Sequence, residues 1–122
     1  MEALQWLLHL LAILLDIPLA EREYYDAFIN GGRVAVCIKT ARRDLVVESV
    51  EVDGRHYVPA LIRLCGAAQV DDGKIKIPKN STAALEVEYI GEPQRVRLAT
   101  DRKQVELKVY RHGHCPALPT QA

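Results

Sequence analysis

The feature that most constrains the fold of this chain is a series of short segments, after Gly32, in which apolar and polar residues alternate. Alternation with a period of two places every second side chain on one face, which is the pattern of a β-strand packed on one side only. We expect the apolar side chains to face a core, and the Glu and Arg side chains to face solvent and form cross-strand pairs. The clearest segments are AALEVEYI, QRVRLAT and QVELKVY, at residues 83–90, 94–100 and 104–110.

Further segments of the same kind lie upstream, at residues 33–39, 45–52, 55–64 and 74–77. The Asp53-Gly54 dipeptide follows the second of these and is the strongest hairpin signal in the chain. Pro59 lies within the third, and because proline cannot donate to a ladder, that segment is expected at an edge or a bulge. About seven short strands at this spacing predict a mainly-β fold, an immunoglobulin-like antiparallel sandwich.

The N-terminal stretch follows a different pattern. Residues 3–15 are mostly apolar, and a helix over them would be about 20 Å long. A helix that crosses a bilayer needs about 20 apolar residues, so this run is short for a span. On a helical wheel the polar residues Glu2, Gln5, His9 and Asp16 fall within an arc of roughly 80°. The predicted hydrophobic helix therefore has a narrow polar stripe and a wide apolar surface.

Four interpretations of this helix remain open. As a signal peptide it lacks a basic leading region, and as a membrane anchor it would have to accommodate His9 and Asp16. As a helix packed on its own domain it has more apolar surface than one small β-domain usually covers. We favour burial against copies of the chain or a partner, because large apolar faces left outward are association sites. The expected contact residues are Leu4, Trp6, Leu7, Leu10, Leu11, Ile13 and Leu14.

The predicted organisation has three parts: a hydrophobic helix and connector over residues 1–30, a β-sandwich over residues 31–111 and a flexible tail over residues 112–122. Sixteen basic and sixteen acidic residues cancel, so no overall field favours nucleic acid or an anionic membrane surface. The hydrophobic fraction of 49% argues against a wholly disordered chain. We expect no nucleic-acid partner and no small-molecule substrate, whereas membrane contact through the helix stays open.

Three cysteines, Cys37, Cys65 and Cys115, are too few and too scattered for a disulfide scaffold. A bridge between Cys37 and Cys65 is geometrically possible if their strands face each other, and two buried free thiols are the alternative. The NST triplet that begins at Asn80 is an N-glycosylation acceptor sequence in a predicted turn.

The RHGHC cluster at residues 111–115 is the only candidate for metal chemistry in the sequence. Imidazole and thiolate groups from His112, His114 and Cys115 could ligate a borderline metal ion. A closed zinc site needs a fourth ligand, for which only His56 is available, and the spacing matches no structural zinc pattern. A nucleophile built from Cys115 and His112 would lack an orienting group, and no hydrolase, phosphate-loop or metalloprotease motif occurs. We therefore predict no enzyme activity, no catalytic residue, no metal and no cofactor.

An apolar N-terminal helix that leads straight into a small sandwich resembles the archaeal type IV pilin and archaellin superfamily. VAVCIKTARRDLVVESVEVDG resembles that family's strand, polar turn, strand and DG hairpin, and VRLATDRKQVELKV resembles its closing hairpin. IPKNSTAALEVEY resembles its turn of proline and small polar residues before a long strand. The likeness covers roughly residues 3–110. It implies that residues 4–17 form an assembly helix in a filament core and that residues 33–110 form the outer domain.

These observations predict a structural subunit that self-assembles through its N-terminal helix, as a pilin-like filament or surface-appendage component. Such a subunit would be a homo-oligomer located outside the cell or at its surface. The alternative is a binding module, either membrane-anchored or soluble, that recognises a protein partner through its loops or an edge strand.

Overall fold

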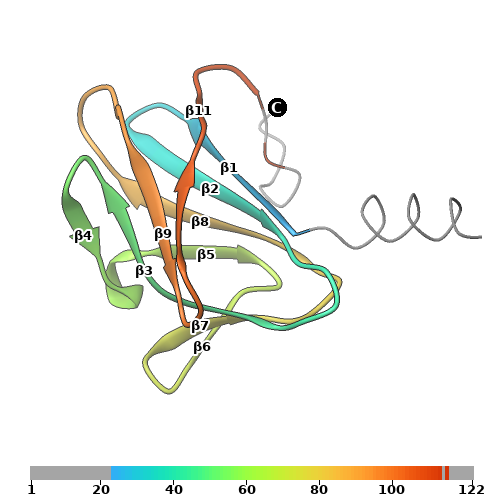
Figure 1. Cartoon of the computed structure of the whole chain (residues 1–122). Helices are drawn as coiled ribbons and strands as arrows, with labels where there is room; N and C mark the ends of the chain where they lie inside the picture. Colours follow the sequence, from blue (N-terminus) through green and yellow to red (C-terminus); the bar gives the residue numbers. More distant parts are fainter. Residues whose placement is uncertain (1–22, 114, 116–122) are drawn as a thin grey trace, which may run out of the picture.

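A computed structural model of the chain describes residues 23–113 and residue 115. The described residues form a mainly-β sandwich of two sheets (Figure 1), which confirms the predicted class. The sheets contain eleven strands rather than about seven. Segments 55–64 and 104–110 each divide into two strands, and residues 24–29 and 69–71 add two more. No α-helix occurs among the described residues, and the predicted hydrophobic helix lies outside them.

The first sheet, sheet A, has five strands in the order β11, β1, β2, β8 and β5. Their bounds are Val109–Tyr110, Tyr24–Ile29, Arg33–Lys39, Thr82–Glu88 and Arg63–Gly66. All neighbours in sheet A are antiparallel except β1 and β11, which are parallel.

The second sheet, sheet B, has the order β10, β9, β3, β7 and β6, and β4 also pairs with β3. Their bounds are Gln104–Leu107, Val96–Thr100, Leu45–Val52, Lys74–Ile77, Gln69–Asp71 and, for β4, Arg55–Tyr57. A short 3-10 turn, η1 at Pro59–Leu61, carries the chain from β4 in sheet B to β5 in sheet A. Pro59 therefore lies between two short strands, where no ladder needs its missing N–H.

Residues 24–29 correct the predicted boundary between the N-terminal connector and the sandwich. They form β1, which pairs along its whole length with β2, so the prediction that the sandwich begins at residue 31 is wrong. The segment YYDAFI contains the aromatic residues that strands favour, and its central residue, Ala27, is fully buried.

The core lies between the sheets and is built from the alternate, inward-facing side chains of both. The predicted inward residues Leu85, Val87, Val96 and Leu98 are at most 1% exposed. Burying a side chain of this size contributes about 1.5–3 kcal/mol to folding. The other large, fully buried side chains are Val34, Val36, Ile38, Leu45, Val47, Val50, Val52, Ile75 and Ile77.

The outer face of sheet B carries a ladder of cross-strand ion pairs, as the sequence predicts. Glu51 lies between His56 and Arg97, with N–O distances of 3.2 and 3.8 Å. Glu106 in turn lies between Arg97 and Arg95, with distances from Nε to Oε1 of 3.6 and 2.6 Å. Because these groups are partly exposed, each pair contributes only tenths of a kcal/mol to about 1 kcal/mol.

The outer face of sheet A is different, because its two central strands are buried on both sides. Ala35 and Cys37 of β2 and Ala84 of β8 point away from the core, yet they are at most 6% exposed. Glu86 was predicted to face solvent, and it is only 7% exposed. Glu86 lies between Ala35 of β2 and Arg63 of β5 in the sheet, and its carboxylate lies 4.0 Å from the Arg63 guanidinium.

The Asp53-Gly54 turn between β3 and β4 confirms the hairpin prediction. Both residues have positive φ, 49° and 87°, which such a tight turn requires and which glycine adopts without strain. The carboxylate of Asp53 accepts hydrogen bonds from the main-chain N–H groups of Gln94 and Arg95, at 2.9 and 2.8 Å, and from the Tyr89 hydroxyl. The turn is thus tied to the connection between β8 and β9.

We predict that this carboxylate makes stability depend on acid pH. The hydrogen bond from Tyr89, together with those from the main chain, lowers the pKa of Asp53 in the folded protein. The ionised group therefore stabilises the fold above the unfolded value of about 3.9, and this contribution is lost as pH falls through the lower folded pKa. Asp53→Asn should lower the urea midpoint at pH 7, and the difference from the parent chain should shrink towards pH 2.

The matched control is Asp72→Asn, which changes an exposed aspartate at the corresponding turn position, with a φ of 52°. This variant should follow the parent chain at every pH. An Asp53→Asn variant that differs from the parent by the same amount from pH 7 to pH 2 would contradict the assignment.

Candidate functional site

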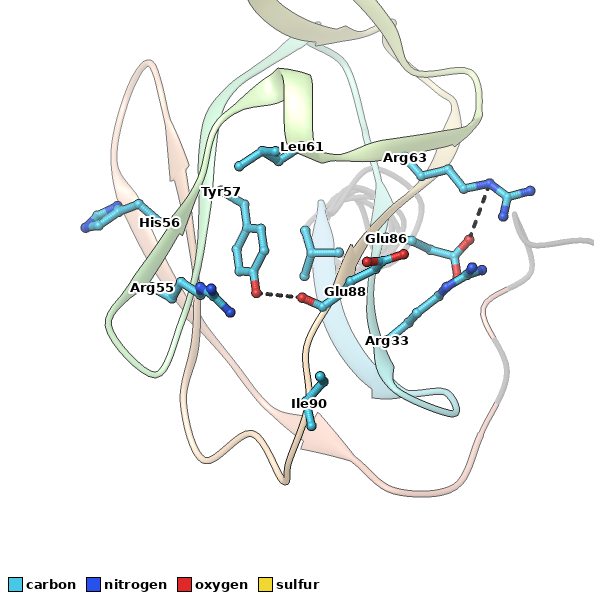
Figure 2. A pocket seen from close by; sticks show the side chains of 10 residues that line it. Arg33, Arg55, His56, Tyr57, Leu61, Arg63, Glu86, Glu88 and Ile90 are labelled. Atoms are coloured by element: carbon cyan, nitrogen blue, oxygen red, sulfur yellow. Dashed lines mark hydrogen bonds and ion pairs between the residues drawn. The ribbon is translucent and has the colours of Figure 1, made fainter.

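A pocket of about 470 Å³ opens at the edge of sheet A, between β5, β8 and the β4 strand of sheet B (Figure 2). It exists because β5 begins at Arg63, opposite Glu86, so that the last two residues of β8 extend beyond β5. The Tyr57 hydroxyl from β4 donates to the main-chain oxygen of Glu88 at 2.6 Å. The Tyr57 hydroxyl thus pairs with a main-chain oxygen of β8 at a position that β5 does not reach.

The charged groups of this edge pocket are unevenly paired. Arg63 lies 4.0 Å from the buried carboxylate of Glu86 (Figure 2). Arg33 and Arg55 also line the pocket, and neither has a carboxylate oxygen within 4.0 Å among the described residues. The Arg55 guanidinium lies 6.0 Å from the ring centroid of Tyr57, at the limit of a cation–π contact.

The rim of the edge pocket is apolar and exposed. Leu61 is 62% exposed and Ile90 is 96% exposed. Exposed aliphatic groups beside Tyr and Arg side chains are typical of surfaces that bind other proteins. His56 points away from this cavity in Figure 2 and pairs with Glu51 on the outer face of sheet B. The arrangement is suited to binding, and no nucleophile–base pair is found among its lining residues.

A disulfide joins Cys37 to Cys115, with 5.6 Å between their Cα atoms, and Cys65 is free. The pairing of Cys37 with Cys65 that the sequence left possible is therefore wrong, and so is the alternative in which both are free thiols. Both residues lie opposite Ala84, one on each side of β8, so they are two strands apart. At about 4.8 Å per strand their Cα atoms are nearly 10 Å apart, beyond the roughly 7 Å that a disulfide can bridge.

Gly113 allows the C-terminal segment to reach Cys37. The parallel pairing of β11 with β1 places Tyr110 beside Phe28, with the rings stacked at 5.5 Å. The chain then passes so close to Phe28 that a Cβ atom at position 113 would lie 2.5 Å from that ring. Cys115 is 1% exposed and held by the bridge, so the predicted flexible tail does not begin at residue 112. Residues 116–122 lie outside the described residues.

The other residues that the sequence singled out, for metal binding, catalysis or assembly, do not come together in one site among the described residues. The Cys115 sulfur is in the disulfide, so it is not a thiolate for a metal or a nucleophile. His112 is exposed, and His114 lies outside the described residues, as do the seven expected contact residues of the N-terminal helix. Within residues 23–113 and 115, no three His, Cys, Asp or Glu side chains gather in a group that could hold a metal ion.

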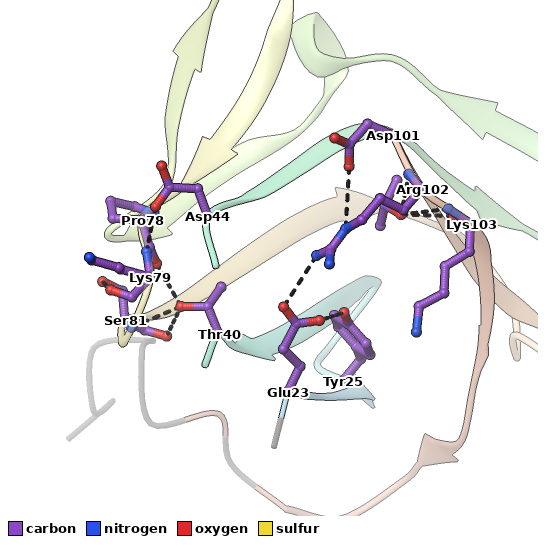
Figure 3. A network of polar contacts seen from close by, with 11 residues as sticks. Glu23, Tyr25, Thr40, Asp44, Pro78, Lys79, Ser81, Asp101, Arg102 and Lys103 are labelled. Atoms are coloured by element: carbon purple, nitrogen blue, oxygen red, sulfur yellow. Dashed lines mark hydrogen bonds and ion pairs between the residues drawn. The ribbon is translucent and has the colours of Figure 1, made fainter. Parts of the chain in front are cut away.

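Asn80 is exposed in the turn between β7 and β8, where its main-chain N–H donates to the Ala41 oxygen at 2.7 Å. Around this turn the Thr40 hydroxyl donates to the Pro78 oxygen at 2.6 Å, and the Lys79 N–H donates to Asp44 at 2.9 Å (Figure 3). The turn is therefore ordered and open to solvent. Glycosylation of Asn80 stays a prediction.

A polar clasp holds the start of β1 to the other sheet (Figure 3). The carboxylate of Glu23 lies 3.3 Å from the guanidinium of Arg102, in the turn between β9 and β10, and accepts a hydrogen bond from the Tyr25 hydroxyl at 2.7 Å. Burial, and then the bond to Glu23, raises the pKa of Tyr25, so its phenol stays protonated and donates. The point at which the N-terminal segment joins the sandwich is thus fixed to both sheets.

Comparison of the chain with family models, with curated proteins and with solved structures finds no match. Among the residues that the structure describes, there is no helix of the length and apolarity needed to span a membrane.

We predict that the Cys37–Cys115 bridge is a large part of the stability of the sandwich. It closes a loop with a sequence separation of 78 residues, for which the chain-entropy account gives about 4.5 kcal/mol. Cys115→Ser should lower the free energy of unfolding by an amount of this order, measured by urea denaturation. The parent chain should lose the same stability when it is reduced.

Cys65→Ser is the matched control, since it changes a thiol that forms no bridge, and its midpoint should stay close to that of the parent chain. Equal midpoints for Cys115→Ser and the oxidised parent would contradict a stabilising role for the bridge.

Proposed function

We propose that this chain is a structural subunit that self-assembles through the apolar segment at residues 4–17, with the β-sandwich as the outer domain. The supporting observation is that the sandwich begins with β1 at Tyr24, directly after the N-terminal segment, and closes a core between strands that all follow it. On this proposal the apolar residues upstream of Glu23 are available for association.

The polar clasp supports the same proposal. A segment that joins subunits must be held firmly where it enters the folded domain. Glu23 and Tyr25 provide this attachment, because Arg102 links them to the opposite sheet. The contact residues of the proposed assembly helix are Leu4, Trp6, Leu7, Leu10, Leu11, Ile13 and Leu14.

We further propose that the sandwich is immunoglobulin-like and that the subunit belongs to a pilin-like filament or surface appendage. The two-sheet architecture and the resemblance of the strand segments to the archaeal pilins and archaellins support this reading. A location outside the cell or at its surface is compatible with the Cys37–Cys115 bridge, since disulfides persist in oxidising compartments.

A second candidate function, a binding module, is supported by the edge pocket. Arg33 and Arg55 face that cavity without a carboxylate within 4.0 Å among the described residues, and Leu61 and Ile90 are exposed at its rim. A protein partner with acidic and apolar groups would pair the arginines and cover the rim.

The double substitution Leu11→Glu with Leu14→Glu tests the assembly proposal. Loss of two buried leucines removes about 3–6 kcal/mol of apolar contact, which weakens association at least about 100-fold. Light scattering and negative-stain imaging should show large ordered assemblies for the parent chain and none for the variant. Circular dichroism should show the same β content in both.

The matched control is Gln5→Glu with His9→Glu, which adds the same two carboxylates to the predicted polar stripe and should leave assembly intact. Normal assembly of the Leu11→Glu and Leu14→Glu variant would refute the proposal. A parent chain that is monomeric would also refute it and would favour the binding module.

A further inference from the structure

The three cysteines of this chain meet around one alanine on the outer face of sheet A. Ala84 of β8 is the register partner of Cys37 on one side and of Cys65 on the other. Cys37, Ala84 and Cys115 form a buried cluster, and Cys65 packs against it. Because an alanine separates the two flanking cysteines, no large side chain stands between Cys65 and the bridge.

Cys115 therefore has two cysteines within the same contact cluster. It is bonded to Cys37, with 5.6 Å between their Cα atoms. Cys65 occupies the equivalent position on the opposite side of β8 and carries a free thiol. A free thiol packed against a disulfide is the arrangement that thiol–disulfide exchange requires.

We propose that Cys65 is a second attachment site for Cys115, reached by intramolecular thiol–disulfide exchange. The Cys65 thiol gives its proton to solvent, and the thiolate sulfur attacks the Sγ atom of Cys115. The Cys65–Cys115 bond forms as the Cys37–Cys115 bond breaks, and Cys37 leaves as a thiolate that takes a proton from solvent. The chain has one disulfide before and after, so no external oxidant or reductant is needed.

The chain bridged at Cys37–Cys115 and the chain bridged at Cys65–Cys115 differ in the accessibility of the remaining free thiol. With the bridge at Cys37, the free thiol is on Cys65, which is partly exposed on the edge strand β5 of sheet A. With the bridge at Cys65, the free thiol is on Cys37, which lies in the central strand β2 and is 6% exposed. Exchange thus withdraws a partly exposed thiol from the surface while Cys115 stays attached to sheet A.

The groups around Cys65 set the rate of disulfide exchange through the pKa of its thiol. Burial, and then the neighbouring carboxylate of Glu86, raises the pKa of the Cys65 thiol, and Arg63 partly opposes this. The other groups packed against it, Ala84 and the bridged cysteines, do not titrate. Because only the thiolate attacks, and its fraction rises tenfold per pH unit below the pKa, exchange should be about 100-fold faster at pH 9 than at pH 7.

The oxidised full-length chain allows a direct test, because its cysteines fall in three different tryptic peptides, residues 34–39, 64–74 and 112–122. The chain is incubated at pH 7 or pH 9, its free thiols are alkylated at intervals, and the peptides are quantified by mass spectrometry before reduction. Alkylated Cys37 and the linked peptides 64–74 and 112–122 should appear together, at a rate independent of protein concentration.

Alkylation confined to Cys65 at pH 9 throughout the incubation would overturn the proposal. A rate proportional to protein concentration would also overturn it, because exchange would then be between molecules.

Two variants of the full chain give an independent test. Under air oxidation Cys37→Ser should form a Cys65–Cys115 bridge, whereas Cys115→Ser should keep two free thiols because Cys37 and Cys65 are two strands apart. Two free thiols in Cys37→Ser would count against the proposal. So would a Cys37–Cys65 bridge in Cys115→Ser. These readouts do not depend on self-assembly, so the exchange can fail while the assembly proposal stands, and the reverse.

Discussion

The pairing of β2 with β8 is the interaction on which the rest of this molecule depends. The two strands run antiparallel over seven register pairs, from Arg33 opposite Glu88 to Lys39 opposite Thr82. Their inward side chains supply one wall of the core. Their outer edges receive β1 and β5, so all of sheet A is assembled on this pair. Their outward side chains are small at Ala35, Cys37 and Ala84, which leaves room for Cys115 to pack against the sheet.

The two outer faces of the sandwich therefore differ in the side chains that they carry. Sheet B presents a ladder in which the carboxylates of Glu51 and Glu106 lie between basic side chains, as suits a face in water. The outer face of sheet A carries the cysteine cluster around Ala84 and, on β1 and β11, the stacked rings of Phe28 and Tyr110. The chemistry that distinguishes this chain from a plain sandwich is thus concentrated on sheet A and at its β5 edge.

Local patterns predicted much of sheet formation. The bounds expected at 33–39, 45–52 and 74–77 coincide with those of β2, β3 and β7, because each segment has a regular period and a clear turn beside it. β1 was missed because YYDAFI follows a hydrophobic run that indicates a helix, and its pairing with β2 and β11 is a tertiary contact. Short-range signals identify strands well, but they do not specify which strands become neighbours.

The candidate sites depend on which strands are neighbours, which local sequence patterns do not specify. Whether Cys37 can reach Cys65 follows from the strand order, in which β8 intervenes between β2 and β5. The edge pocket combines Arg33 and Arg55 from different sheets, so no motif in the sequence marks it. Gly113 was the one local signal of the bridge between Cys37 and Cys115, because a glycine two residues before Cys115 permits the chain to cross close to Phe28.

The position of β1 relative to the disulfide has a mechanical consequence. The bridge encloses residues 37–115 in a covalent loop, and β1 lies entirely before that loop. Tension between the N-terminal segment and the bridge would act first on the end of β1 where Asp26 lies opposite Cys37, so the hydrogen bonds between β1 and β2 would break in succession from that end. The Cys37–Cys115 bridge prevents the chain between these two residues from being extended. Under such tension, β1 and the part of β2 before Cys37 would yield first, while the strands inside the loop stay protected.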